Sequence, residues 1–233
     1  MTRRIIIGNY TYSSWSMRGW LAVDHSGLAH ETVRLAMDTP EFAATIKAYS
    51  PTGQVPVLQD GDITVHDSLA IIDYLARTAP DHYWWPEDKA AYALARSVSS
   101  EMHSSFLTLR RSCPMNLRRS YKGLTYSDAL MRDINRIEAI WTECRTRFGA
   151  QESKRPGPFL FGAFSAADMM FAPVVSRFIT YGIASRTGAS ALVRAYITAV
   201  NSYRPIDLWY KAAQLEKERI ATSELDQNIT HIG

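Results

Sequence analysis

The pattern of apolar and polar residues predicts strands and helices in alternation over the first third of the chain. Residues 5–7 form a compact apolar run typical of a buried strand, and apolar residues then recur with helical spacing from Ser14 or Trp15 to His25. Residues 31–36 alternate as a second strand, and residues 41–48, after Pro40, read as a short helix. A helix between the first two strands allows them to pair in parallel.

A hairpin and a third helix follow. Residues 55–59 and 63–65 are strand-like and are joined by Asp60-Gly61, a strong turn signal, and residues 68–78 read as a helix. Pro56 has no N–H to donate to a sheet, and a Val-Pro bond can adopt the cis form. With the proline at a sheet edge or after a cis bond, the main chain of Val55 is free for another partner. The predicted order of elements over the first third of the chain is βαβαββα.

Strand signals end after the segment 79–88, which carries two prolines and Trp84-Trp85 and is predicted to be a linker. Helical spacing then predicts helices over residues 89–109, 125–148, 165–181, 189–202 and 206–223. We therefore expect an α/β domain at 1–80 and an all-α domain at 89–233. Ser165-x-x-Asp168 nearly matches a capping box, which predicts a helix start at this position. Residues 222–233 are predicted to be loosely ordered.

Composition narrows the class of protein. The chain has 233 residues, 46% of them hydrophobic, and a formal net charge of +3 with dispersed basic residues, which favours neither nucleic acid nor membrane as a partner. Its two cysteines, Cys113 and Cys144, have no metal-ligand spacing and fit a reduced, cytoplasmic setting. We expect no metal site, and no run has signal-peptide or membrane-spanning character.

Two stretches carry a specific family resemblance. SPTGQVPVL at 50–58 and HDSLAIIDYLAR at 66–77 resemble the glutathione-binding half of the cytosolic glutathione transferases, which implies a thioredoxin-like first domain. By that resemblance the main chain of Val55, shaped by Pro56, pairs with the cysteinyl part of glutathione, and Asp67 and Ser68 hold its γ-glutamyl end. The start of a helix suits a carboxylate. For the glycyl carboxylate the candidates are, in order, Gln54 and Lys47.

The start of the first helix offers hydroxyl groups that could stabilise a thiolate. The run Ser13-Ser14-Trp15-Ser16-Met17-Arg18 resembles the Ser-Ser-Cys-x-x-Arg signature of zeta-class transferases, which include maleylacetoacetate isomerase. Carried across, Ser13 is the first candidate to contact the sulfur, Ser14 the second and Tyr10 the third. Trp15 replaces the cysteine of that signature, which excludes a cysteine-based thiol-disulfide role at this position.

The electrophile is expected between the domains. Trp15 and one helical face with Met102, His103, Phe106 and Arg110 are candidates to line its site. The pair Arg110-Arg111, together with Arg177, leaves an acidic substrate open. We expect a homodimeric transferase that adds glutathione to small, mostly apolar electrophiles. A glutathione-dependent isomerase, a dehalogenase and a non-catalytic binding protein of this fold are the alternatives.

Overall fold

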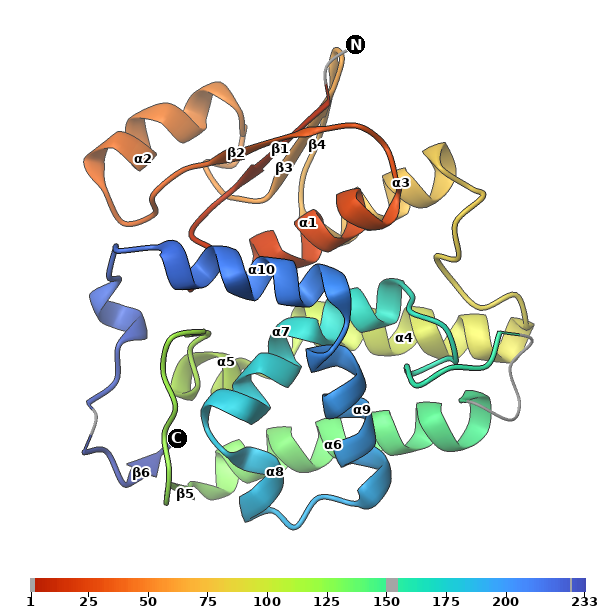
Figure 1. Cartoon of the computed structure of the whole chain (residues 1–233), viewed down its shortest axis with the longest axis vertical. Coiled ribbons are helices and arrows are strands. Elements are labelled where there is room, and N and C mark those ends of the chain that lie inside the picture. The colour runs from red at the N-terminus through yellow and green to blue at the C-terminus, as the bar shows by residue number, and fades with distance from the viewer. Residues whose placement is uncertain (1–2, 150–154, 227) are drawn as a thin grey trace.

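The computed structural model describes residues 3–149, 155–226 and 228–233, and it places a four-stranded sheet at one end of the molecule (Figure 1). The strands are β1 (Arg3–Ile7), β2 (Glu31–Arg34), β3 (Val57–Asp60) and β4 (Ile63–Val65), in the spatial order β2-β1-β3-β4. β1 and β2 are parallel, whereas β3 is antiparallel to both of its neighbours. The predicted crossover and hairpin are both confirmed.

The period-two alternation of the strands sorts apolar side chains to two faces of the sheet. Ile5 and Ile7 point into the main core with α1 (Ser14–His25) and α3 (Ser68–Thr78), while Ile6 packs with Val57 and Ile46 on the opposite face. That second face is covered by α2 (Pro40–Thr45) and the short 3₁₀ turn η1 (Ile46–Ala48) (Figure 1). The expected βαβαββα order is therefore present.

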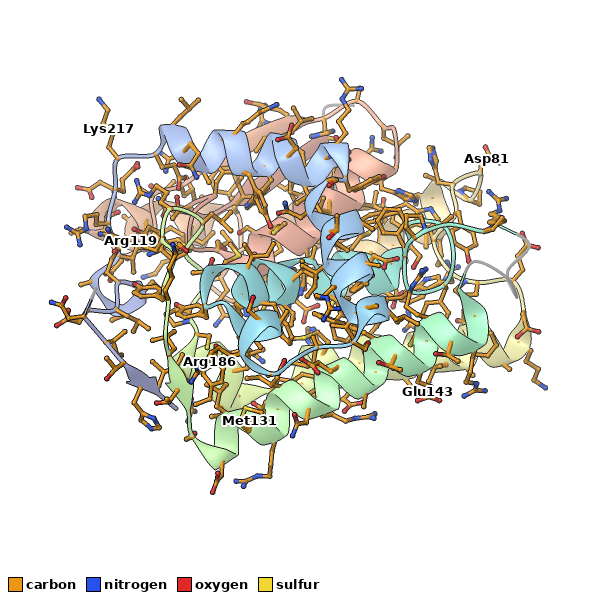
Figure 2. All side chains as sticks on the ribbon, turned by 60° about the horizontal axis from the view of Figure 1, so that its bottom comes forward. Asp81, Arg119, Met131, Glu143, Arg186 and Lys217 are labelled. Atoms are coloured by element: carbon orange, nitrogen blue, oxygen red, sulfur yellow. The ribbon has the colours of Figure 1, made fainter. Side chains whose placement is uncertain are left out.

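The rest of the chain is largely helical, as predicted. Its helices are α4 (Lys89–Ser104), α5 (Leu107–Ser112), α6 (Asp128–Phe148), α7 (Ala166–Thr180), α8 (Ile183–Arg186), α9 (Ala191–Asn201) and α10 (Arg204–Leu215). α7 is buried along almost its whole length and contacts α1, α4 and α9. α6 lies along an outer edge, where Met131 and Glu143 mark its course (Figure 2).

The apolar core runs without interruption from α1 and α3 into α7, because residues of both halves belong to one cluster. The division into domains 1–80 and 89–233 therefore stays a prediction. Among the described residues, no helix combines the length and the apolar character that crossing a bilayer requires.

Three predicted helices have other limits than expected. The helix predicted over 89–109 is broken at Phe106, which has φ +59° and precedes α5. The helix predicted from 125 begins at Asp128, because β5 (Thr125–Tyr126) pairs in parallel with β6 (His231–Ile232). α10 ends at Leu215 and not near 223. The pairing of β5 with β6 joins residues about a hundred positions apart in the chain, so no local sequence pattern indicates it.

The expectation of a loose C-terminal segment is wrong for the described part of 222–233, and residue 227 lies outside the described residues. The Glu224 carboxylate accepts hydrogen bonds from the Tyr12 hydroxyl at 2.6 Å and the Arg119 guanidinium at 2.9 Å. Ile232 is buried in the core. The segment is polar and lacks periodicity, so long-range ion pairs and one buried side chain give it order that composition does not indicate.

The predicted capping box at the start of α7 is confirmed. The Asp168 carboxylate accepts the N–H and the hydroxyl of Ser165, both at 2.9 Å, and the N–H of Leu160 at 3.0 Å. Ser165 and Asp168 have no exposed surface. The box therefore fixes both the start of the central helix and the loop before it.

Candidate functional site

A hollow of about 400 Å³ lies where the loop before β3, the start of α3 and the first turn of α1 meet α4 and α5. Its lining residues are Trp15, Thr52, Gln54, Val55, Pro56, His66, Asp67, Ser68, His103 and Arg110. The structure thus brings together all but one of the predicted glutathione-binding residues. The exception is Lys47, which is exposed on η1 and is not among the lining residues.

The loop at Val55 has the shape that the sequence suggested. The Val55–Pro56 peptide bond is cis, and among the described residues the main chain of Val55 makes no hydrogen bond. The Pro56 ring packs on α1 at Gly19, where an added Cβ would lie 2.8 Å from Pro56 Cγ. A glycine inside an apolar helix was the available signal for this close approach, and the sequence prediction missed it.

Asp67 and Ser68 form the start of α3. Asp67 caps the helix through Oδ1, which accepts the N–H groups of Leu69 at 3.0 Å and Ala70 at 3.2 Å, while Oδ2 lies 3.1 Å from His103 Nε2. Ser68 is fully buried, and its hydroxyl has no hydrogen-bond partner among the described residues. A buried polar group without a partner is rare in native structures, so its position at the wall of a hollow points to a ligand.

The two candidate serines at the start of α1 differ in what their hydroxyls do. Ser13 is buried, and its Oγ donates to Ser16 Oγ at 2.7 Å and accepts the Ser16 N–H at 3.3 Å. Ser14 is partly exposed, and its Oγ accepts a long bond of 3.4 Å from Arg177 Nη2. The Ser13 hydroxyl is therefore used as the helix cap, and the Ser14 hydroxyl is the more available of the two.

Tyr10, the third candidate, lies elsewhere. Its ring packs on Trp209 with the centroids 4.6 Å apart, and it lines a different hollow beside the end of α10. The pKa of Tyr10 is raised by burial and, second, by the charge of Glu216. Its ring is thus directed away from the hollow at Val55.

Three arginines surround the first turn of α1. The guanidinium carbons of Arg18 and Arg110 lie 4.4 and 4.7 Å from the centroid of the Trp15 ring. The buried Arg18 and Arg177 donate to main-chain carbonyl oxygens, and none of the three forms an ion pair with a carboxylate among the described residues. Burial lowers the pKa of Arg18, with Arg177 and Arg110 adding to the effect, and burial lowers the pKa of Arg177 to about 10.

Two predicted substrate-site residues do not line the hollow. Met102 has no exposed surface and Phe106 is almost fully buried, and both belong to the apolar core. Trp15, His103 and Arg110 do line it, as the expected helical face predicted. Adjacent residues of a helix point about 100° apart, so within α4 Met102 packs in the core while His103 lines the hollow.

Thr52 and His66 complete the lining and were not among the predicted site residues. A group of His, Cys, Asp or Glu side chains that could hold a metal ion does not occur in the part of the chain that the structure describes.

Comparison with known proteins identifies relatives of this chain. The family model described as the N-terminal domain of glutathione S-transferase matches residues 12–78. Human glutathione S-transferase theta-1 is 44% identical over 66 residues, which cover 28% of this chain and 26% of that protein. Maleylacetoacetate isomerase of Rattus norvegicus is 30% identical over 108 residues, 45% of this chain and 50% of that protein. The chain thus spans half or less of the length of these two relatives.

The fold extends the likeness beyond these aligned segments. A crystal structure of a glutathione transferase homolog from Burkholderia GL BGR1, with bound glutathione, has a TM-score of 0.66 at 19% identity. That match covers 92% of this chain and 99% of the other, and it concerns the fold alone. Residues 12–78, from the turn before α1 to the end of α3, thus match the N-terminal domain of glutathione S-transferase, and the helical region after them shares the fold of a glutathione transferase homolog.

Proposed function

We propose that this protein is an enzyme that activates the thiol of glutathione and adds it to small electrophiles. The observation that carries the proposal is the buried hydroxyl of Ser68, which has no partner among the described residues and lies at the wall of the hollow that Val55 and Pro56 also line. Glutathione supplies the sulfur nucleophile, and the chain's own residues bind the tripeptide and stabilise its thiolate.

The assignments within the site follow from the donors and acceptors present. Ser68 and the first amides of α3 suit the γ-glutamyl carboxylate, and Asp67 suits the ammonium group beside it. The free main chain of Val55 can pair with the cysteinyl residue. Gln54 is the candidate for the glycyl carboxylate, and the exposed Lys47 remains second to it.

We propose Ser14 as the residue that donates a hydrogen bond to the sulfur. Ser14 is a partly exposed residue at the first position of α1, directly before Trp15 of the hollow, and the unpaired amides of this helix start carry partial positive charge. Arg177, which already reaches the Ser14 hydroxyl, adds a full positive charge beside it. Both features favour a thiolate, while Trp15 and Arg110 form the wall on the side of the electrophile.

Calorimetry with reduced glutathione tests the proposal together with the ultraviolet absorbance of the thiolate in the complex. Binding heat, a thiolate band at neutral pH and turnover of an aryl chloride electrophile are expected. Binding without a thiolate band would favour the non-catalytic alternative, and absence of binding would refute the site.

Replacing Ser68 with alanine is expected to weaken glutathione binding by about tenfold or more, because a hydrogen bond to a charged group contributes roughly 1.5–3 kcal/mol. The melting temperature should stay the same or rise, since the hydroxyl has no partner in the part of the chain that the structure describes. Calorimetry and thermal denaturation of the variant measure both quantities.

Ser99→Ala is the matched control for this variant. Ser99 on α4 is also fully buried, and its hydroxyl likewise has no hydrogen-bond partner in the described ranges, but it does not line the hollow. It should leave the affinity for glutathione unchanged. Equal affinities of the Ser68→Ala variant and the wild type would remove Ser68 from the site.

The three arginines favour a second candidate, a glutathione-dependent isomerase of an acidic cis-olefin. Arg18, Arg110 and Arg177 have no carboxylate partner among the described residues, and Arg110 reaches the hollow itself. An anionic substrate would supply the missing charge. Arg110→Gln should then raise the KM of an acidic olefin about tenfold and leave that of an uncharged aryl chloride within about twofold. Equal effects on both substrates would contradict this candidate.

A homodimer and a cytoplasmic setting remain proposals, based on the family resemblance. Light scattering coupled to size-exclusion chromatography measures the oligomeric state directly, and a monomeric mass at micromolar concentration would exclude a stable dimer.

A further inference from the structure

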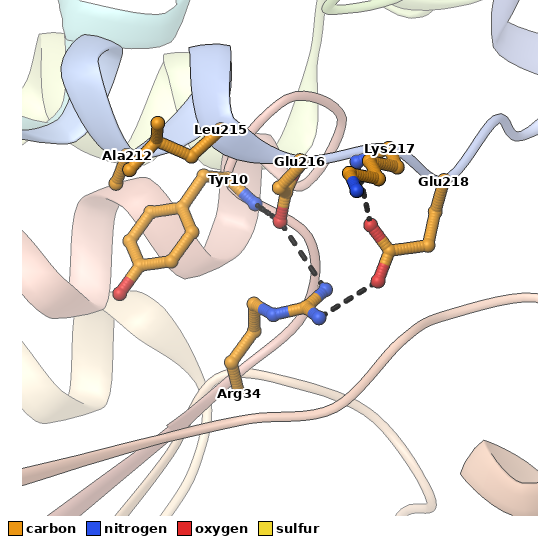
Figure 3. A pocket seen from close by; sticks show the side chains of 7 residues that line it. All are labelled: Tyr10, Arg34, Ala212, Leu215, Glu216, Lys217 and Glu218. Atoms are coloured by element: carbon orange, nitrogen blue, oxygen red, sulfur yellow. Dashed lines mark hydrogen bonds and ion pairs between the residues drawn. The ribbon is translucent and has the colours of Figure 1, made fainter.

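Glu216 is a buried carboxylate at the point where the chain leaves α10 and crosses the loop before α1. Its Oε1 accepts the N–H of Tyr10 at 2.8 Å and its Oε2 accepts the N–H of Thr11 at 2.9 Å. Arg34 Nη1 lies 3.3 Å from the same carboxylate. Figure 3 shows the carboxylate between the guanidinium of Arg34 and the main chain of Tyr10, at the wall of a hollow of about 430 Å³.

The two amides that Glu216 holds belong to the turn that leads into the candidate catalytic helix. Within this turn the Ser13 N–H donates to Asn9 O at 2.9 Å and the Ser14 N–H donates to Tyr12 O at 3.1 Å. Thr11 is fully buried, and its hydroxyl donates to Ala213 O at 3.2 Å. The position of Ser14 therefore depends on a turn whose central amides have a side chain as their acceptor.

Arg118 ties the same two segments together from the other side. Its guanidinium donates to the main-chain oxygen of Glu216, and Nη2 also donates to the Tyr12 hydroxyl at 2.8 Å. Loss of the Glu216 carboxylate would leave the amide of Thr11 buried without an acceptor. Such a group costs roughly 1–3 kcal/mol, which gives the turn reason to rearrange.

We propose that Glu216 is a positioning residue, which fixes the turn at Tyr10 and Thr11 so that Ser14 meets the sulfur of glutathione. The inference rests on the proposed function of the hollow. The direction in which the pKa of the bound glutathione thiol shifts separates this role from a direct electrostatic effect of the Glu216 charge. Glu216 is negative, so removal of its charge alone would make a nearby thiolate more stable, whereas displacement of Ser14 makes it less stable.

The test is the pH titration of the thiolate absorbance in the glutathione complex of Glu216→Gln. Each of the two amides has its own oxygen of Glu216 as acceptor, and the carboxamide replaces one of these oxygens with an NH2 group, which cannot accept a hydrogen bond. The pKa of the bound thiol should rise by about one unit, because Ser14 loses its alignment, and turnover at neutral pH should fall several-fold. Hydrogen exchange at residues 10–14 should become faster in the same variant.

Glu218→Gln is the matched control. Glu218 lies in the same segment and bonds to the same Arg34 at 2.7 Å, but it makes no bond to the amides of Tyr10 or Thr11. It should leave the thiol pKa and the exchange of residues 10–14 unchanged. If Glu216→Gln fails to fold, Glu216→Asp retains the charge but is too short to hold both amides, and the same rise is expected.

A thiol pKa in Glu216→Gln that is equal to or below that of the wild type would overturn the inference. A wild type without a thiolate band would refute the proposed function instead. In that case hydrogen exchange at residues 10–14 of the Glu216→Gln variant is the remaining test of the positioning role. Exchange equal to that of the wild type would refute this role as well.

Discussion

Replacing Ser14 with alanine is expected to lower the turnover of glutathione conjugation by about tenfold or more, with little change in glutathione affinity, because a hydrogen bond to a thiolate contributes roughly 1.5–3 kcal/mol. A free thiol with a pKa of about 8.5 is only a few per cent ionised at neutral pH, so loss of the donor removes most of the nucleophile. Steady-state kinetics and the pH titration of thiolate absorbance measure the effect.

Ser13→Ala distinguishes the two neighbouring hydroxyls. In the wild type, Ser13 Oγ accepts the Ser16 N–H and donates to Ser16 Oγ. The Ser13→Ala variant loses this helix cap and should therefore lose about 0.5–2 kcal/mol of stability. Its thiol pKa should change less than that of Ser14→Ala. A folded Ser13→Ala protein with the larger loss of turnover, beside a nearly normal Ser14→Ala protein, would restore the preference for Ser13 that the family signature implies.

The sequence predicts the sheet and its helices well because their signals are local. The apolar run at Ile5, Ile6 and Ile7 and the helical spacing in α1 each need only a few neighbouring residues. The pairing of Thr125 with His231 depends on a partner far along the chain, and no local pattern contains it. Prediction therefore failed where long-range contacts override the local preference.

The same distinction explains the site. Gln54, Val55 and Pro56, with Asp67 and Ser68, lie in two short motifs, and one fold brings both to the hollow. The choice between Ser13 and Ser14 depends on which hydroxyl the cap consumes, and sequence alone does not specify that. Glu216 follows the last turn of a helix in a polar segment and matches no sequence motif. Its bonds to the amides of Tyr10 and Thr11, which the sequence does not indicate, connect it to the site.

The face expected to line the cleft was predicted only in part. It contained Met102, His103, Phe106 and Arg110, but Phe106 adopts a left-handed conformation and ends the regular helical spacing before Arg110. Within α4, Met102 packs in the core, whereas the adjacent His103 reaches the hollow, where Asp67 is its partner. Helical spacing alone does not say which of two adjacent residues the core covers.

The largest expected effect on stability is that of Asp168→Ala, which should lower the free energy of unfolding by about 3–5 kcal/mol. The fully buried carboxylate accepts the N–H of Leu160 and both the N–H and the hydroxyl of Ser165. Each of these donors would be left without a partner at the start of α7, the helix that contacts α1, α4 and α9. Urea denaturation measures the loss.

Ser127→Ala is the control for this loss. Ser127 caps α6 through the N–H of Leu130 at 3.2 Å but is partly exposed, so its removal should cost only about 1 kcal/mol. If the two variants lost equal stability, the buried network around Asp168 would add nothing to an ordinary helix cap.

The stability cost of Asp168→Asn should also depend on pH. Burial raises the pKa of Asp168 from 3.8 to about 6, against the opposing effect of its hydrogen bonds from Leu160 and Ser165. The native state therefore binds this proton more tightly than the unfolded state, so the contribution of Asp168 is full below about pH 4 and is lost as the pH rises through about 6. The asparagine variant lacks this titration, so its cost should be about 1 kcal/mol greater at pH 5 than at pH 7. Urea denaturation of both proteins at the two pH values measures the difference, and an equal or smaller cost at pH 5 would show that burial does not dominate the environment of this carboxylate.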